Sequence, residues 1–186
     1  MKADEWRTEA WKTIKSTPHL VYLILTKRPE LIANRLPDDW QKEGSWYENV
    51  WFGVSSGCNQ TLNKMDTLRR IPCRIRFLSA EPLLEDISQN INLDNFHWVI
   101  AGGESGSGDE YLWNASKDWK QELNLENGRR TMDVSWAQKL ADACARRYIP
   151  FYFKQFTAPK PGTGETAVDV HQFPKAPWNG EWACKS

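Results

Sequence analysis

One stretch near the middle of the chain limits its possible folds more than any other. Residues 98–101 form an apolar run without alternation, which is typical of a strand buried on both faces of a parallel sheet. Gly102 and Gly103 end the run, and we expect them to allow positive φ angles and a close approach to the main chain. Glu104 and Ser105 follow at once, where a parallel sheet presents its functional groups.

Four further apolar runs end in the same way, in polar residues. They cover residues 20–25, 50–54, 74–78 and 151–153, and helical patterns separate most of them. Alternating strands and helices predict a parallel sheet with right-handed crossovers. We therefore predict an α/β fold with a parallel sheet of about five strands and flanking helices.

Helical periodicity predicts several of the segments between the strands. Apolar side chains recur on one face of residues 4–15 and of residues 62–68. Pro29 suits the first turn of another helix, which we expect to continue to Leu36. Asp133 is expected to cap the strongest helix of the chain.

Polar side chains follow all five predicted strands. Because the carboxyl ends of parallel strands meet at one edge of a sheet, we expect these side chains to line one cleft. Two carboxylates, three cations, hydroxyl groups and a Gly-rich turn suit a zwitterion or a phosphate, and a structural network of ion pairs is the alternative. The candidate ligand-binding residues are Lys27, Arg28, Ser55, Asn59, Ser79, Glu81, Gly102, Gly103, Glu104, Ser105, Lys154 and Gln155.

The charge of the chain is balanced. Its 186 residues include 24 Lys and Arg and 24 Asp and Glu, and the pI is near 6.8. This balance argues against a strongly basic nucleic-acid binder, although it is compatible with a local basic patch. No apolar run approaches the ~20 residues that span a bilayer, and the first residues lack a signal-peptide pattern. We therefore expect no membrane partner and a cytoplasmic location.

The domain organisation is predicted from periodicity. Residues 1–156 contain the strand and helix patterns and are expected to form one domain, with an insertion at residues 107–128. Residues 157–186 contain prolines and little periodicity, so we predict an irregular C-terminal tail.

The insertion carries Tyr111, Trp113 and Trp119. Aromatic side chains on a surface loop are enriched at interfaces, so we predict that these three bind a partner. The chain has 11 tryptophans in all, and most are expected to pack in the core or under a lid. Base stacking on nucleic acid is the alternative.

The four cysteines stand singly, at positions 58, 73, 144 and 184. No two of them have the close spacing of a zinc or iron–sulfur motif, and a reducing compartment disfavours disulfides. The sequence therefore predicts no metal site.

Five motifs, in their order along the chain, resemble a known family. It is a phage and bacterial group of proteins of unknown function that look like radical S-adenosylmethionine barrels and are associated with three-Cys-motif partner proteins. The resemblance covers most of residues 3–155 and implies part of a (β/α)6 barrel similar to a TIM barrel. The motifs are Thr26-Lys27-Arg28-Pro29-Glu30, Asn49-Val50-Trp51-Phe52-Gly53-Val54-Ser55, Arg76-Phe77-Leu78-Ser79-Ala80-Glu81-Pro82-Leu83-Leu84, Trp98 to Gly106, and Phe151-Tyr152-Phe153-Lys154-Gln155.

The chain also departs from this family. Relatives carry an upstream cysteine cluster that should hold a [4Fe–4S] centre, and the four cysteines here cannot replace it by spacing. Cys58 precedes Asn59-Gln60 where relatives carry an acid, and residues 107–128 separate the Gly-rich turn from Arg130-Thr131-Met132. The tail lacks the Asp-Gly-Arg expected after the last strand.

Two functions are compatible with this pattern. In the first, the chain is a cluster-less, non-enzymatic protein of a phage or mobile element. It would bind a macromolecular partner, a protein or nucleoprotein with nucleic acid as a further candidate, and inhibit host defence in the manner of an anti-CRISPR. In the second, it is half of a split or truncated radical enzyme that a partner completes, with S-adenosylmethionine as cofactor. We favour the first, without a cofactor, because no ligand set for a metal is present.

Protein purified anaerobically and treated with iron and sulfide should show no iron–sulfur chromophore, because its cysteines stand singly. Absorption spectroscopy with iron analysis measures this. A stoichiometric, cysteine-dependent band around ~400 nm would contradict the prediction.

Overall fold

A computed structural model describes residues 2–40, 47–106, 125–126, 129–160, 162, 164 and 168–174. Its elements are α1 (Lys2–Ser16), β1 (Tyr22–Thr26), the 3-10 turns η1 (Pro29–Leu31) and η2 (Ala33–Arg35), β2 (Val50–Ser55), η4 (Asn59–Thr61), α2 (Asn63–Arg69), β3 (Ile75–Ala80), β4 (Trp98–Ala101), β5 (Leu125–Glu126), β6 (Arg129–Arg130), α5 (Val134–Ala145) and β7 (Phe151–Phe153).

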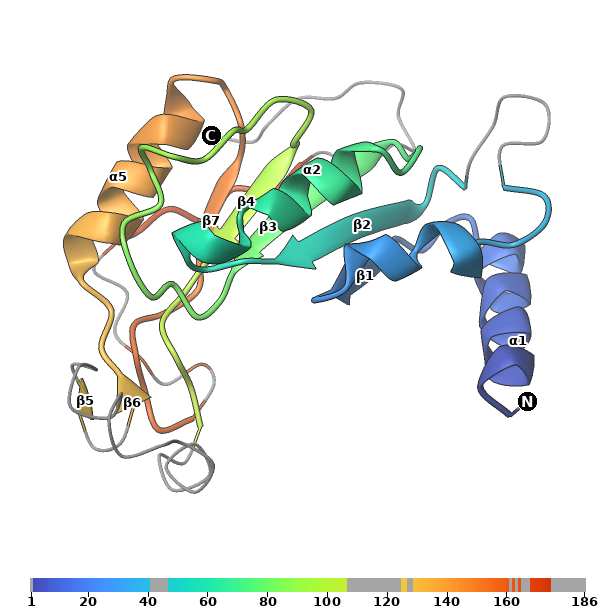
Figure 1. Ribbon diagram of the computed structural model, residues 1–186, viewed down its shortest axis with the longest axis horizontal. Coiled ribbons are helices and arrows are strands. Elements are labelled where there is room, and N and C mark those ends of the chain that lie inside the picture. The colour runs from blue at the N-terminus through green and yellow to red at the C-terminus, as the bar shows by residue number, and fades with distance from the viewer. Residues whose placement is uncertain are drawn as a thin grey trace.

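Five of the strands form one parallel sheet in the order β1-β2-β3-β4-β7 (Figure 1). This result confirms the predicted α/β fold with a parallel sheet and flanking helices. The spatial order of these strands follows the order of the chain without a reversal. The short strands β5 and β6 pair separately as an antiparallel ribbon.

The helices α2 and α5 cover the same face of the sheet, together with the 3-10 turns (Figure 1). Alternate strand residues such as Phe52, Leu78 and Phe151 face them and are almost fully buried. Asp133 accepts a hydrogen bond from the backbone N–H of Ser135, which confirms the predicted cap of α5. This layer is the main hydrophobic core.

The opposite face of the sheet carries a smaller aromatic cluster. Trp51, Phe77 and Trp98 lie on neighbouring strands and are at most 5% exposed. Gly53 pairs in register with Phe77, and a Cβ atom on Gly53 would lie 2.2 Å from the Phe77 ring. The ring therefore fills the space that a side chain at position 53 would need.

The two edges of the sheet differ. At the β7 edge, Phe153 N–H donates to the Val170 carbonyl and Gln172 N–H donates to the Phe151 carbonyl, so residues 170–172 run along this edge. At the other edge, no hydrogen bond among the described residues reaches the outer side of β1. The burial of β1 alternates, with Leu23 and Leu25 half exposed. In the part of the chain that the structure describes, the sheet is thus covered at the β7 edge and open at the β1 edge.

Three expectations of local structure were wrong. Residues 29–36 form two 3-10 turns and no α-helix, and the helical conformation ends before Leu36, which precedes Pro37 and is extended. Strand β3 runs to Ala80, so Ser79 lies inside the strand and not beyond its end. Gly102 and Gly103 do not have positive φ, which among the described glycines is found only at Gly106 and Gly162.

No helix in the described ranges combines the length and apolar character that crossing a bilayer requires.

Gly53→Ala should lower the free energy of unfolding by about 1–3 kcal/mol, because the new methyl group overpacks the buried Phe77 ring. Phe77→Leu removes part of that ring, so the double variant should be more stable than the sum of the two single effects predicts. Chemical denaturation of the four proteins measures the coupling. Strictly additive effects would contradict this account of the aromatic face.

Candidate functional site

The carboxyl ends of β3, β4 and β7 bring three of the predicted site residues together. Glu81 follows β3, Lys154 follows β7, and Lys154 Nζ lies 2.8 Å from Glu81 Oε2. Gly102 lies between them at the end of β4, where a Cβ atom would be 3.4 Å from Lys154 Cβ and 3.6 Å from Glu81 Cγ. The ion pair therefore lies across the carboxyl end of β4, and both of its side chains are partly exposed.

The second predicted carboxylate, Glu104, is buried. Its side chain is 4% exposed, and Oε2 accepts a hydrogen bond of 2.9 Å from the backbone N–H of Arg130. The Arg130 Nε lies 3.2 Å from both carboxylate oxygens, and its Nη2 also donates to Oε1. Glu104 thus fastens the segment that leads into α5 to the end of β4. Glu104 therefore acts as a structural lock, by which we mean a buried carboxylate that holds two segments together. This agrees with the alternative from the sequence analysis, a structural network of ion pairs.

Residues 155–158 form a strap across the Gly-rich turn. Gly103 N–H donates to the Gln155 carbonyl at 2.9 Å, and Ala158 N–H donates to the Glu104 carbonyl at 3.0 Å. Ser105 pairs with Ala158 in an isolated bridge. A Cβ atom on Gly103 would lie 2.3 Å from the Thr157 backbone nitrogen. The close approach expected at this glycine is therefore made by the chain itself.

The remaining predicted residues on this side of the sheet have local partners. Gln155 is buried, and its Oε1 accepts a hydrogen bond from Gly162 N–H. Ser55 Oγ donates to the Glu81 carbonyl at 3.4 Å. Asn59 N–H donates to Glu85 Oε1, and Asn59 Nδ2 donates to the Asp86 carbonyl, so Asn59 joins the start of η4 to the loop after β3.

Lys27 and Arg28 lie at the end of β1, two strands away from β3 in the sheet. Both are exposed, and Arg28 N–H donates to Thr26 Oγ1 at 3.0 Å. The structure thus places both glutamates at one edge of the sheet but gives them different partners. A single cleft that also contains Lys27 stays a prediction. Tyr111, Trp113 and Trp119 lie outside the described residues.

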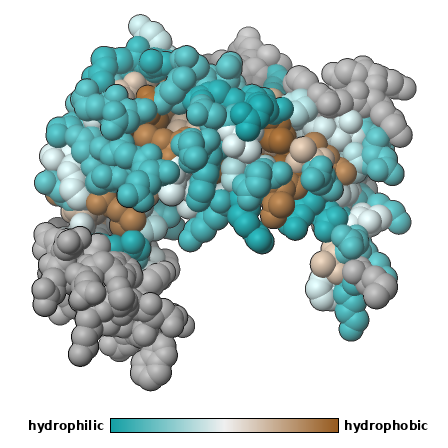
Figure 2. Space-filling model, in the orientation of Figure 1, coloured by the Kyte–Doolittle hydropathy of each residue, from teal (hydrophilic) through white to brown (hydrophobic). Residues whose placement is uncertain are grey.

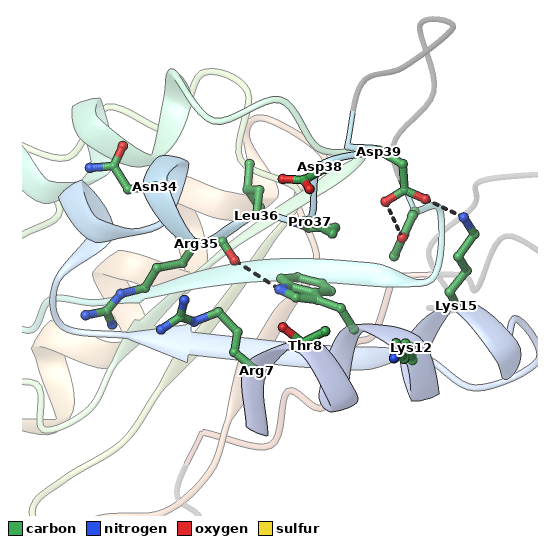
Figure 3. A pocket seen from close by; sticks show the side chains of 12 residues that line it. Arg7, Thr8, Lys12, Lys15, Asn34, Arg35, Leu36, Pro37, Asp38 and Asp39 are labelled. Atoms are coloured by element: carbon green, nitrogen blue, oxygen red, sulfur yellow. Dashed lines mark hydrogen bonds and ion pairs between the residues drawn. The ribbon is translucent and has the colours of Figure 1, made fainter. Parts of the chain in front are cut away.

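Sequence reasoning missed two features. Arg130 was noted only as part of a motif, and its pairing with Glu104 needs a contact between residues 26 positions apart. It also missed the pockets between α1 and the turns η1 and η2, one of which is drawn in Figure 3. The basic residues that line these pockets come from separate elements, and no local sequence pattern shows that they lie close together in the fold.

The buried thiols are held in the protonated form. Burial raises the pKa of Cys73 to about 11 and that of Cys144 to about 12. Thiolates, rather than thiols, ligate metals. Among the described residues, no group of three or more His, Cys, Asp or Glu side chains has an arrangement that could hold a metal ion.

Residues 2–169 match the protein family described as "Protein of unknown function (DUF5131)", and the chain belongs to this family. Searches of the curated proteins and of the solved structures gave no match.

Glu104→Gln should lower the free energy of unfolding by about 2 kcal/mol, because it weakens charged hydrogen bonds in a buried position. Glu81→Gln serves as the matched control and should cost less than about 1 kcal/mol, since Lys154 is largely hydrated. Urea denaturation compares the two. Equal stability of Glu104→Gln and the parent protein would show that Glu104 is not a structural lock.

Proposed function

We propose that this member of the DUF5131 family acts by binding a macromolecular partner through the open edge of its sheet at β1. The observation that carries this proposal is the contrast between the two edges. Residues 170–172 cover β7, whereas β1 presents free main-chain groups among the described residues. An uncovered edge strand is a template for pairing with another chain.

Apolar side chains beside this edge support the proposal. Leu20 is 48% exposed, and Leu23 and Leu25 are each 50% exposed. Figure 2 shows apolar surface in the region of β1 and the 3-10 turns, bordered by hydrophilic residues. Burying the exposed half of one leucine side chain contributes about 1 kcal/mol to association. Main-chain pairing combined with two or three such anchors is sufficient for a specific contact.

The carboxyl edge of the sheet offers less for binding. The carboxylate of Glu104 is buried against Arg130, and Glu81 is paired with Lys154. These charges already neutralise one another, so a ligand there would have to displace internal partners. This comparison favours β1 as the place of recognition.

The order of the strands supports a barrel segment. Consecutive parallel strands without a reversal, with helices on one face, are also expected of a segment of a (β/α)6 barrel, and in such a barrel a further strand would pair with β1. The same edge therefore serves the alternative function, in which the partner supplies further strands and a cysteine cluster and completes a radical S-adenosylmethionine enzyme. In the favoured form the partner is a protein or nucleoprotein of the host cell, and binding inhibits its defence.

The test is a double variant of β1. Leu23→Thr with Leu25→Thr removes two apolar anchors and introduces β-branched residues, which favour a strand. The variant should melt as the parent protein does and should bind its partner about 30-fold more weakly, which corresponds to about 2 kcal/mol. Capture from host lysate identifies the partner, and titration with the purified partner measures the affinity.

Val134→Thr is the matched control, because Val134 is 47% exposed on α5 and should leave binding unchanged. Equal weakening by the control, or full binding by the β1 variant, would contradict the proposal. Dimerisation of the purified protein through β1 would also contradict it, and sedimentation detects that outcome. Iron and labile sulfide in the purified complex would select the enzyme alternative.

A further inference from the structure

A pocket of about 300 Å³ lies between α1 and the turns η1 and η2. Its floor is apolar and is formed by Trp11, Ile24, Leu31 and Leu36. A second hollow of about 450 Å³ adjoins it and shares four lining residues with it (Figure 3). Both volumes are in the range of pockets that bind small ligands.

Three arginine residues line the smaller pocket. They come from Arg7 on α1, Arg28 before η1 and Arg35 on η2, and no described residue that lines this pocket is acidic. Arg7 pairs with Asp4 at 2.8 Å, and that carboxylate is itself 68% exposed. Within the described ranges, neither Arg28 nor Arg35 forms an ion pair. The pocket therefore has an excess of positive charge over an apolar floor.

The side chains of Arg7 and Arg35 extend in the same direction in Figure 3, and both residues line the same hollow. Trp11 Nε1 donates a hydrogen bond of 2.9 Å to the Arg35 carbonyl, which ties η2 to α1. The like charges of these two arginines repel each other. Their placement on elements that are bonded together prepares them for an anion, which would relieve this repulsion.

One lysine of the larger hollow, Lys15, is already paired with a carboxylate. Lys15 Nζ donates to Asp39, and Tyr47 OH donates to the same carboxylate at 2.7 Å. The hydrogen bond from Lys15 is the main cause that lowers the pKa of Asp39, and burial together with Asp39 raises the pKa of Tyr47 to about 12. Lys15 and Asp39 therefore neutralise one another, whereas Arg7, Lys12 and Arg35 also line the larger hollow.

We infer that the pocket binds a phosphate monoester that carries a small apolar group. Guanidinium groups bind phosphate through paired hydrogen bonds, and a phosphate dianion matches several arginines better than a singly charged carboxylate does. The apolar group would lie on the floor formed by Ile24, Leu31 and Leu36. The pocket shares Ile24 and Leu25 with β1, and Leu23, which does not line it, separates this inference from the proposed function.

Calorimetric titration of the full chain with phenyl phosphate tests the inference, with inorganic phosphate and phenylacetate as comparison probes. Phenyl phosphate should bind at least about tenfold more tightly than either, because only it has both the dianion and the apolar group. Arg35→Ala should weaken its binding by about tenfold or more, while the backbone carbonyl that Trp11 uses is retained.

Arg146→Ala is the matched control, since Arg146 is an exposed arginine at the end of α5. It should bind phenyl phosphate as the parent protein does. Leu23→Thr should also leave this binding unchanged, because Leu23 does not line the pocket. Equal affinity for phenyl phosphate and inorganic phosphate, an unchanged affinity of Arg35→Ala, or no binding at millimolar probe would each overturn the inference.

Discussion

The parallel pairing of consecutive strands is the constraint on which the rest of the structure depends. Each strand from β1 to β3 pairs with the next one in the chain, and β4 pairs with β7. Among the described residues, β1 therefore has β2 as its only strand neighbour. It also brings all carboxyl ends to one edge, where the ion pairs of Glu81 and Glu104 form. The open edge and the charged edge are therefore two consequences of one topology.

The strands and the strongest helix could be predicted from the sequence because their signals are local. The apolar run of β4 and the cap at Asp133 both have the predicted structure. The 3-10 turns could not be predicted from the periodicity of residues 29–36, since apolar spacing does not distinguish one α-helix from two short 3-10 turns that end before Pro37. The polar residues after the strands likewise predicted that Glu81 and Glu104 lie at one edge of the sheet, but they did not predict the partners of these two carboxylates.

The candidate site was harder to predict because its contacts join residues that are far apart in the sequence. Residues such as Gly103 and Gln155 resemble binding groups in the sequence, and in the structure they hold the strap at residues 155–158. Arg7, Arg28 and Arg35 converge only after α1 has packed beside the 3-10 turns. A sequence shows which groups are polar, and tertiary packing decides which of them the chain uses for itself.

Site-specific photo-cross-linking tests the central claim most directly. A photoreactive amino acid at position 23 or position 134 labels two apolar sites of similar exposure, one on β1 and one on α5. In cells that contain the partner, the account predicts a discrete cross-linked product from position 23 and none from position 134. A product from position 134 alone, or equal products from both, would contradict recognition through the open edge of the sheet.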